Sequence, residues 1–174
     1  MEASEGDLLS RGYGAVLWEP DDKTVRNARI TRFMSWLTVG RGLEFGGYED
    51  LWQWSVARPA EFWTAIWDYF EVLGDRGAGP ALAGQVMPDV RWFEGATLNY
   101  ARNALRTAWT DPDRTAIIFE AERGRAGSLS YAQLAAEVAR VAGGLRALGV
   151  GRGDRVAALL PNVPEAVIGL LATA

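Results

Sequence analysis

The chain of 174 residues contains no cysteine and no histidine. Their absence excludes disulfide bridges, zinc sites built from Cys and His, thiol nucleophiles and Ser-His-Asp triads within this chain. Of the 18 lysines and arginines, Lys23 is the only lysine. Any reaction that needs a lysine therefore has one candidate here. The lack of cysteine also fits a reducing, cytosolic compartment.

An excess of positive charge and a long apolar run are absent as well. The net charge of -4 and the pI near 5 provide no basic surface, so we expect neither nucleic acid nor an anionic membrane as partner. The N-terminal segment MEASEGDLLSRGYGAVLW is acidic and lacks the features of a secretory signal, which favours a cytoplasmic protein. The most apolar window, 155–174, contains Arg155, Glu165 and two prolines. Crossing a bilayer needs about 20 apolar residues, so no transmembrane helix is predicted.

The chain does contain enough apolar side chains for a core, and their spacing in the first half is helical. Hydrophobic residues make up 49% of the sequence, and all eight tryptophans lie between Trp18 and Trp109. A helix is predicted after Asp21 or Asp22, which can cap it, and it ends at Gly40 and Gly42. Its inner face carries Ile30, Phe33, Met34 and Leu37.

Two further helices are predicted, a short one from Tyr48 and another from Pro59, because proline suits a first helical turn. The inner face expected for the second comprises Phe62, Trp63, Ile66, Phe70 and Leu73. Such an aromatic stripe could form a ligand pocket. We favour a packing role, because large rings at helical spacing usually bury a helix face against a core.

Residues 75–90 hold three glycines and two prolines and are expected to form an irregular connector. A helix is then predicted from about Thr97 to Trp109, with Leu98, Ala101, Leu105 and Ala108 facing inward. Asn99 and Asn103 lie one turn apart, and we expect them to form surface or capping hydrogen bonds.

From residue 110 onward the pattern alternates between strand and helix. RTAIIFEAE predicts a strand whose Glu120 and Glu122 share one face. Two such carboxylates could serve acid/base catalysis, but a solvated strand end is the better interpretation, because no base or metal ligand accompanies them. A helix of about 18 residues follows, with Ser130 and Gln133 forming a capping box. Its apolar stripe comprises Leu134, Val138, Val141, Leu145 and Leu148.

The glycine-rich segment ALGVGRGDRVAAL, 147–159, poses the question of a nucleotide site. Phosphate-binding loops lead from a strand into a helix, whereas this one follows a helix. Gly149 stands where a left-handed residue commonly ends a helix, and RVAALL predicts the next buried strand. We therefore expect a helix-to-strand turn here.

A last helix is predicted from Pro164. Strand, helix, strand and helix in this order open a right-handed parallel α/β sheet, which two strands cannot complete. The expected fold is thus α/β: a helical N-terminal extension followed by the first strand-helix-strand-helix of a larger domain, truncated.

Four segments resemble one enzyme family, in the family's order. SLSYAQL and GLRALGVGRGDRVAALLPNVPEAVIGLLA resemble the opening of the large domain of the adenylate-forming acyl-CoA synthetases. WFEGATLNYARNAL is similar to the N-terminal region of the short-chain branch, which contains acetyl-, propionyl- and acetoacetyl-CoA synthetases. LWEP, ITRFMSWL and YEDLWQWSVARPAEFW point within that branch to the acetoacetyl-CoA synthetases. The resemblance covers nearly everything from Leu17 to the end.

The resemblance implies a ligase that uses ATP, Mg²⁺ and coenzyme A. Its substrate acid, here acetoacetate, becomes an acyl-adenylate with release of pyrophosphate, and the thiol of coenzyme A then displaces AMP. The family's lysine-ended phosphate loop, its adenine and ribose contacts and its C-terminal lysine lie downstream of Ala174 in the family's order. Lys23 matches no family lysine. We therefore assign no catalytic, cofactor-binding or metal-binding residue, and expect these residues alone to be inactive and to bind no cofactor.

By the same resemblance we expect residues 1–16 to be flexible, 17–109 to form the Trp-rich helical region of short-chain acyl-CoA synthetases, and 110–174 to begin the AMP-binding domain. Two alternatives remain open. One is an acetyl- or propionyl-CoA synthetase, because the acid-binding pocket is not in this sequence. The other is a non-catalytic module whose aromatic helices bind a partner protein.

Overall fold

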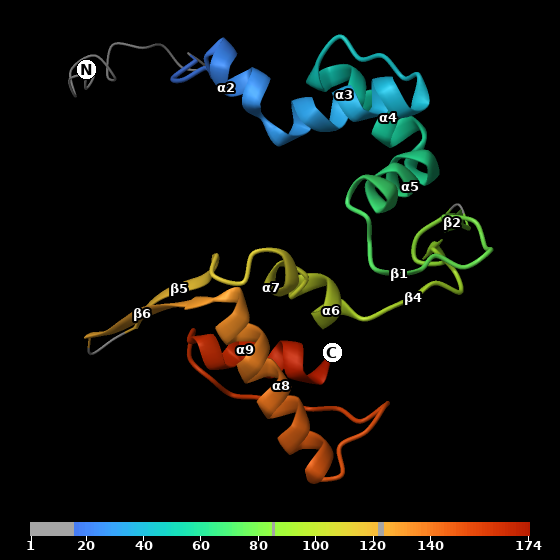
Figure 1. Ribbon diagram of the computed structural model, residues 1–174. Coiled ribbons are helices and arrows are strands. Elements are labelled where there is room, and N and C mark those ends of the chain that lie inside the picture. The colour runs from blue at the N-terminus through green and yellow to red at the C-terminus, as the bar shows by residue number, and fades with distance from the viewer. Residues whose placement is uncertain (1–15, 85, 122–123) are drawn as a thin grey trace. The chain divides into compact units, whose positions relative to one another are not determined.

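The computed structural model describes residues 16–84, 86–121 and 124–174, which belong to two compact units. The first unit ends at Phe70 and is helical, and the second runs from Glu71 to Ala174 and combines helices with two-stranded sheets (Figure 1). A helical region followed by a mixed α/β region was predicted. The segment expected to be flexible, 1–16, lies outside the described residues except for Val16.

The first predicted helix is divided in two. α2 (Asp22–Asn27) begins at Asp21, whose carboxylate accepts a backbone N–H at 2.7 Å, so the predicted cap is confirmed. Ala28 is extended, with ψ of 143°, and ends α2. The hydroxyl of Thr31 donates to the Val25 carbonyl at 2.6 Å across this break. Such local side-chain bonds compete with helical ones, and an apolar periodicity does not reveal them.

The three longer helices of the first unit surround one core. α3 (Arg29–Arg41) ends at Gly42, which is left-handed with φ of 66°, as predicted. α4 (Tyr48–Ala57) and α5 (Pro59–Tyr69) follow, and α5 begins at the predicted proline. The buried side chains of this core are Phe33, Leu37, Leu51 and Ala65.

The inner face of α5 differs from the predicted one. Phe62 and Ile66 pack against the core, whereas Trp63 and Phe70 are 45% and 53% exposed. Contact at Ala65 sets the buried stripe at 62, 65, 66 and 69, which leaves Trp63 on the flank. Since α5 ends at Tyr69, neither Phe70 nor Leu73 continues its helical spacing.

The connector in the second unit is more regular than expected. β1 (Gly74–Asp75) pairs with β4 (Thr97–Leu98), and β2 (Leu82–Ala83) pairs with β3 (Arg91–Trp92), so that two antiparallel ladders are nested. A Cβ on Gly74 would lie 2.7 Å from the Thr97 carbonyl oxygen. This close approach requires glycine at position 74, immediately before the connector.

The helix predicted over 97–109 is interrupted in the structure. Thr97 and Leu98 belong to β4, after which α6 (Tyr100–Ala104) and α7 (Thr107–Thr110) form separate short helices. The pairing of β4 with a segment more than 20 residues away overrides the local preference, which is why periodicity did not indicate it. Leu98, expected to face inward, is 49% exposed.

Both asparagines of this region form structural hydrogen bonds. Asn99 is the N-cap of α6, and its side chain accepts the Arg102 N–H at 2.7 Å, which confirms the capping role. The Asn103 side chain accepts the Leu73 N–H at 2.8 Å and donates to the Leu73 carbonyl at 2.9 Å. The amide of Asn103 thus supplies both hydrogen bonds that a neighbouring strand would give to Leu73.

The predicted strand after residue 114 is confirmed as β5 (Thr115–Ala121), which forms an antiparallel hairpin with β6 (Arg125–Ser130). In Figure 1 this hairpin extends away from the helices of its unit. The sequence did not predict β6, whose alanine, glycine and serines disfavour strands. Gly127 lies opposite Phe119, and its missing side chain leaves room for the Phe119 ring.

The core of the second unit lies where α8 (Tyr131–Ala147) and α9 (Pro164–Thr173) pack side by side (Figure 1). The capping box of Ser130 and Gln133 is present, and α9 begins at the predicted proline. Leu148, expected on the buried stripe, is 83% exposed, because it is the C-cap beyond the last turn. The buried residues of this core are Ala101, Leu105, Leu134, Val138, Ile168 and Leu171.

The structure requires a correction at 155–160, the segment expected to be a buried strand. These residues join no sheet within the described part of the chain, and Leu159 is fully exposed. A parallel strand needs a neighbour with which to form hydrogen bonds. β5, the strand that precedes it in the predicted order, pairs with β6 instead.

Candidate functional site

The glycine-rich turn that raised the question of a nucleotide site ends α8. The Gly149 N–H donates to the Arg146 carbonyl at 2.9 Å, and the Val150 N–H donates to the Leu145 carbonyl at 3.0 Å. With φ of 89° at Gly149, these two bonds form the Schellman pattern that closes a helix. The predicted helix end is confirmed.

The rest of this turn is bonded to itself. The Asp154 carboxylate accepts the Gly151 N–H at 2.8 Å, and the Asp154 N–H donates to the Gly151 carbonyl at 3.1 Å. α9 does not begin until Pro164, so no helix N-terminus follows the glycines directly. The turn therefore lacks the arrangement of free N–H groups and helix dipole that binds a phosphate.

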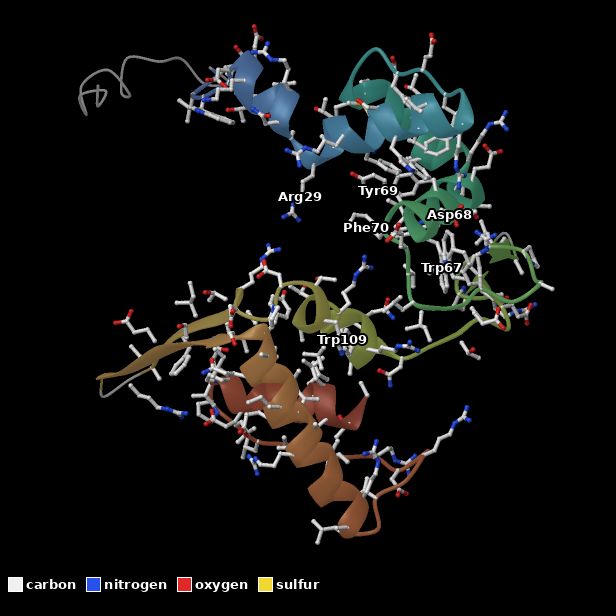
Figure 2. The ribbon with its side chains drawn as sticks, in the orientation of Figure 1. Arg29, Trp67, Asp68, Tyr69, Phe70 and Trp109 are labelled. Carbon is white, nitrogen blue, oxygen red and sulfur yellow. The ribbon has the colours of Figure 1, made fainter. Side chains whose placement is uncertain are left out.

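A groove of about 610 Å³ lies in the first unit and is formed by α3, α4 and α5. We call it the aromatic groove. In Figure 2, Arg29 at the start of α3 and Tyr69 and Phe70 at the end of α5 lie on the same side of α3. Its lining comprises Arg29, Ile30, Arg32, Phe33, Tyr48, Leu51, Trp52, Ser55, Phe62, Ile66, Tyr69 and Phe70.

Aromatic packing fixes the floor of the groove. The ring of Phe33 lies 5.0 Å from that of Tyr69 and 6.2 Å from that of Phe62, in edge-to-face geometry. The ring of Trp54 packs against that of Phe62 in edge-to-face geometry, with ring centroids 5.8 Å apart. Edge-to-face contacts of this kind are favourable beyond their buried area. The packing role predicted for the aromatic stripe is thus correct for Phe62, and the inner position predicted for Phe33 on the first helix is correct as well. Tyr48 and Trp52 remain 61% and 44% exposed beside them.

The charge of the groove is positive. Arg29 and Arg32 are exposed and line it, and no carboxylate is among its lining residues. The hydroxyl of Ser55 donates to the Trp52 carbonyl at 2.7 Å, which leaves it no activating base. The groove can bind an apolar group that carries negative charge, but it offers no nucleophile or acid/base pair. The sequence did not reveal the groove, although the spacing of Arg29 and Arg32, one helical turn apart, places both on one face of α3.

A second charged feature joins β6 to α9. Arg125 donates to both carboxylate oxygens of Glu165, at 2.6 and 3.5 Å, and its guanidinium lies 5.5 Å from the centre of the Phe119 ring. The hydrogen bond from Arg125 lowers the pKa of Glu165. The same bond raises the pKa of Arg125. This pair fastens the hairpin to α9, and we assign it a structural role.

The other candidates from the sequence have no catalytic surroundings. Glu120 is exposed on β5, and Glu122 lies outside the described residues. Lys23 is exposed on α2. In the described ranges, no group of three or more Asp and Glu side chains could hold a metal ion.

Comparisons with known proteins identify the class. The family model described as "Acetyl-coenzyme A synthetase N-terminus" matches residues 48–104, and the model described as "AMP-binding enzyme" matches residues 105–174. The two matches are consecutive and together cover most of the chain. Residues 48–174 are therefore similar to consecutive parts of AMP-binding acyl-CoA synthetases.

The relatives narrow this class. The chain is 39% identical to the acetoacetyl-coenzyme A synthetase of Rhizobium meliloti over 158 residues, and 35% identical to that of Rattus norvegicus over 162 residues. A solved structure, acetoacetyl-CoA synthetase from Streptomyces lividans, matches with a TM-score of 0.82 and 44% identity over 90% of this chain. Over most of its length the chain is thus similar to acetoacetyl-CoA synthetases. It spans about a quarter of the length of these relatives, 24% in each case.

No helix of the described residues is both long enough and apolar enough to cross a membrane.

Proposed function

We propose that the protein takes part in the AMP-forming ligation of acetoacetate to coenzyme A. Acetoacetate, ATP and coenzyme A would give acetoacetyl-CoA, AMP and pyrophosphate through an acyl-adenylate. The observation that carries this proposal is the similarity along 90% of the chain to an acetoacetyl-CoA synthetase structure at 44% identity. The acetyl-CoA synthetase of Halorhodospira halophila, at 37% identity over 76% of the chain, makes acetate the nearest alternative substrate.

Within that reaction we assign this chain a scaffolding role. The described residues fit neither ATP nor Mg²⁺: the glycine-rich turn is bonded to itself, and the carboxylates are not gathered into a metal site. We therefore derive no chemical step through ATP, Mg²⁺ or coenzyme A from these residues. The boundary between the helical region and the AMP-binding domain is proposed to lie near residue 110.

The substrate is tested by measuring thioester formation. The protein, expressed from its complete reading frame, is given ATP, Mg²⁺ and coenzyme A with acetoacetate, acetate or propionate in turn. We expect the highest kcat/KM with acetoacetate. Faster turnover of acetate or propionate would refute the substrate while keeping the reaction, and no thioester with any acid would refute the ligase itself.

A non-catalytic protein-interaction module is the second candidate, and the open aromatic groove favours it. The reading frame separates the two candidates. Continuation beyond LLATA into a Ser/Thr/Gly-rich loop that ends in lysine supports the ligase, whereas a stop codon there supports the module. We further propose a cytoplasmic location and no nucleic-acid partner, in line with the absence of cysteine and the net charge of -4.

A further inference from the structure

We propose that the turn at the start of the second unit, residues 71–73, is held closed by a side-chain latch. The latch is the amide of Asn103 on α6, assisted by Arg106. Release of Asn103 would open the turn while the core of the second unit stays folded. This inference goes beyond the proposed function and does not depend on it.

The turn begins in a strained backbone conformation. Glu71 has φ of 48°, in the left-handed region that residues other than glycine rarely adopt. It follows Phe70, the C-cap of α5, and so stands at the position where glycine commonly ends a helix without this strain. Strained residues persist where the surrounding structure holds them in place. We therefore expect neighbouring groups to keep Glu71 left-handed.

Two side chains hold the turn. The side-chain oxygen of Asn103 accepts the Leu73 N–H at 2.8 Å, and its nitrogen donates to the Leu73 carbonyl at 2.9 Å. The Arg106 guanidinium donates to the Glu71 carbonyl at 3.3 Å and lies 3.8 Å from the Glu71 carboxylate. This ion pair is exposed and contributes little, whereas the bonds of Asn103 to Leu73 are partly buried. Asn103 is therefore the main part of the latch.

The latch is anchored in a core, and the turn is not. Ala101 on α6 and Leu105 at its C-cap are both buried in the core of the second unit. By contrast, no described residue between 71 and 98 belongs to either hydrophobic core. Segments with few buried apolar contacts open at a lower free energy than the whole fold. Loss of the Asn103 bonds should thus free the turn without unfolding the core.

The turn also lies where the chain passes from the first unit to the second, because the first unit ends at Phe70. Hinges in proteins are commonly a few residues at the end of an element that absorb a change in backbone angles. A strained turn held by one amide has this character. Residues 71–73 thus act as a hinge that Asn103 keeps closed.

Hydrogen–deuterium exchange followed by mass spectrometry tests the latch in the protein expressed from its complete reading frame. Asn103→Leu removes both bonds to Leu73 at similar side-chain size, so exchange over 71–75 should become about tenfold faster, while exchange within α8 should not change. Asn27→Ala is the control, because it removes a side-chain bond to the Lys23 carbonyl on α2 and should leave both regions unchanged. Unchanged exchange over 71–75 in Asn103→Leu, or an equal rise within α8, would overturn the proposal.

Relief of the strain supplies a second measurement, with the opposite sign. Glu71→Gly should slow exchange over 71–75 several-fold, because glycine adopts φ of 48° without strain. Val72→Gly is the matched control: φ at Val72 is not positive, so glycine there only adds backbone freedom and should speed exchange. If both glycine variants sped exchange equally, Glu71 would not be a strained residue held by the latch, and the proposal would be wrong.

Discussion

Truncation of Leu37 should destabilise the first unit more than any exposed change on the same helix. The Leu37 side chain is 0% exposed and lies in the core with Phe33, Leu51 and Ala65. Leu37→Ala removes three carbons, worth about 0.8 kcal/mol each, or about 2.4 kcal/mol in transfer free energy. The cavity that remains adds to this, so we expect the free energy of unfolding to fall by about 3 kcal/mol.

The assay is urea unfolding followed by tryptophan fluorescence. Six of the eight tryptophans precede residue 70, so the signal reports mainly on the first unit. At an m-value of about 1–3 kcal/mol per M, the midpoint should fall by about 1–3 M. Val39→Ala is the matched control, because Val39 lies on α3 and is 90% exposed. If both variants shifted the midpoint equally, the assignment of Leu37 to the core would be refuted.

Three further outcomes are expected in the second unit. Gly149→Ala should lower the free energy of unfolding by about 1–2 kcal/mol, because φ at Gly149 is 89°. Gly144→Ala should raise it by up to about 1 kcal/mol, because Gly144 is helical and faces open space. If thermal melts ranked the two variants in the opposite order, the assignment of Gly149 as the left-handed end of α8 would be refuted. Ser130→Ala should cost about 1 kcal/mol and speed amide exchange at the start of α8. The pKa of Glu165, measured by NMR, should lie below the ordinary glutamate value and should rise in Arg125→Ala. Because folding lowers this pKa, the pair stabilises the folded protein at neutral pH, and its contribution is lost as the pH falls through the pKa of the folded state.

Local signals in the sequence predicted the helices well where a cap or proline marks a boundary. Pro59, Pro164 and the capping box at Ser130 each begin the helix that was expected. These signals act on backbone groups within four residues along the chain, so they can be recognised from the amino-acid sequence without knowledge of distant contacts. The ends at Gly42 and Gly149 follow the same logic.

The features that the sequence did not reveal depend on distant partners. β4 exists because it pairs with β1, and this pairing shortens the helix expected from Thr97. Residues 155–160 have strand-like composition but no neighbour to pair with among the described residues. The aromatic groove likewise requires the packing of three helices, since its floor combines Phe33 of α3 with Phe62 and Tyr69 of α5 and its lining extends to α4. The sequence predicted Phe33 and Phe62 of the floor as packing residues, but it did not predict that a solvent-accessible groove lies above them.

Acetoacetate-dependent exchange of pyrophosphate into ATP tests the central claim most directly, because it reports adenylation without the later thioester step. The protein expressed from its complete reading frame should catalyse this exchange, whereas residues 1–174 alone should not. Exchange by the 174 residues alone would contradict the scaffolding role. The absence of exchange with the complete polypeptide, supplied with ATP, Mg²⁺ and acetoacetate, would contradict the proposed ligase.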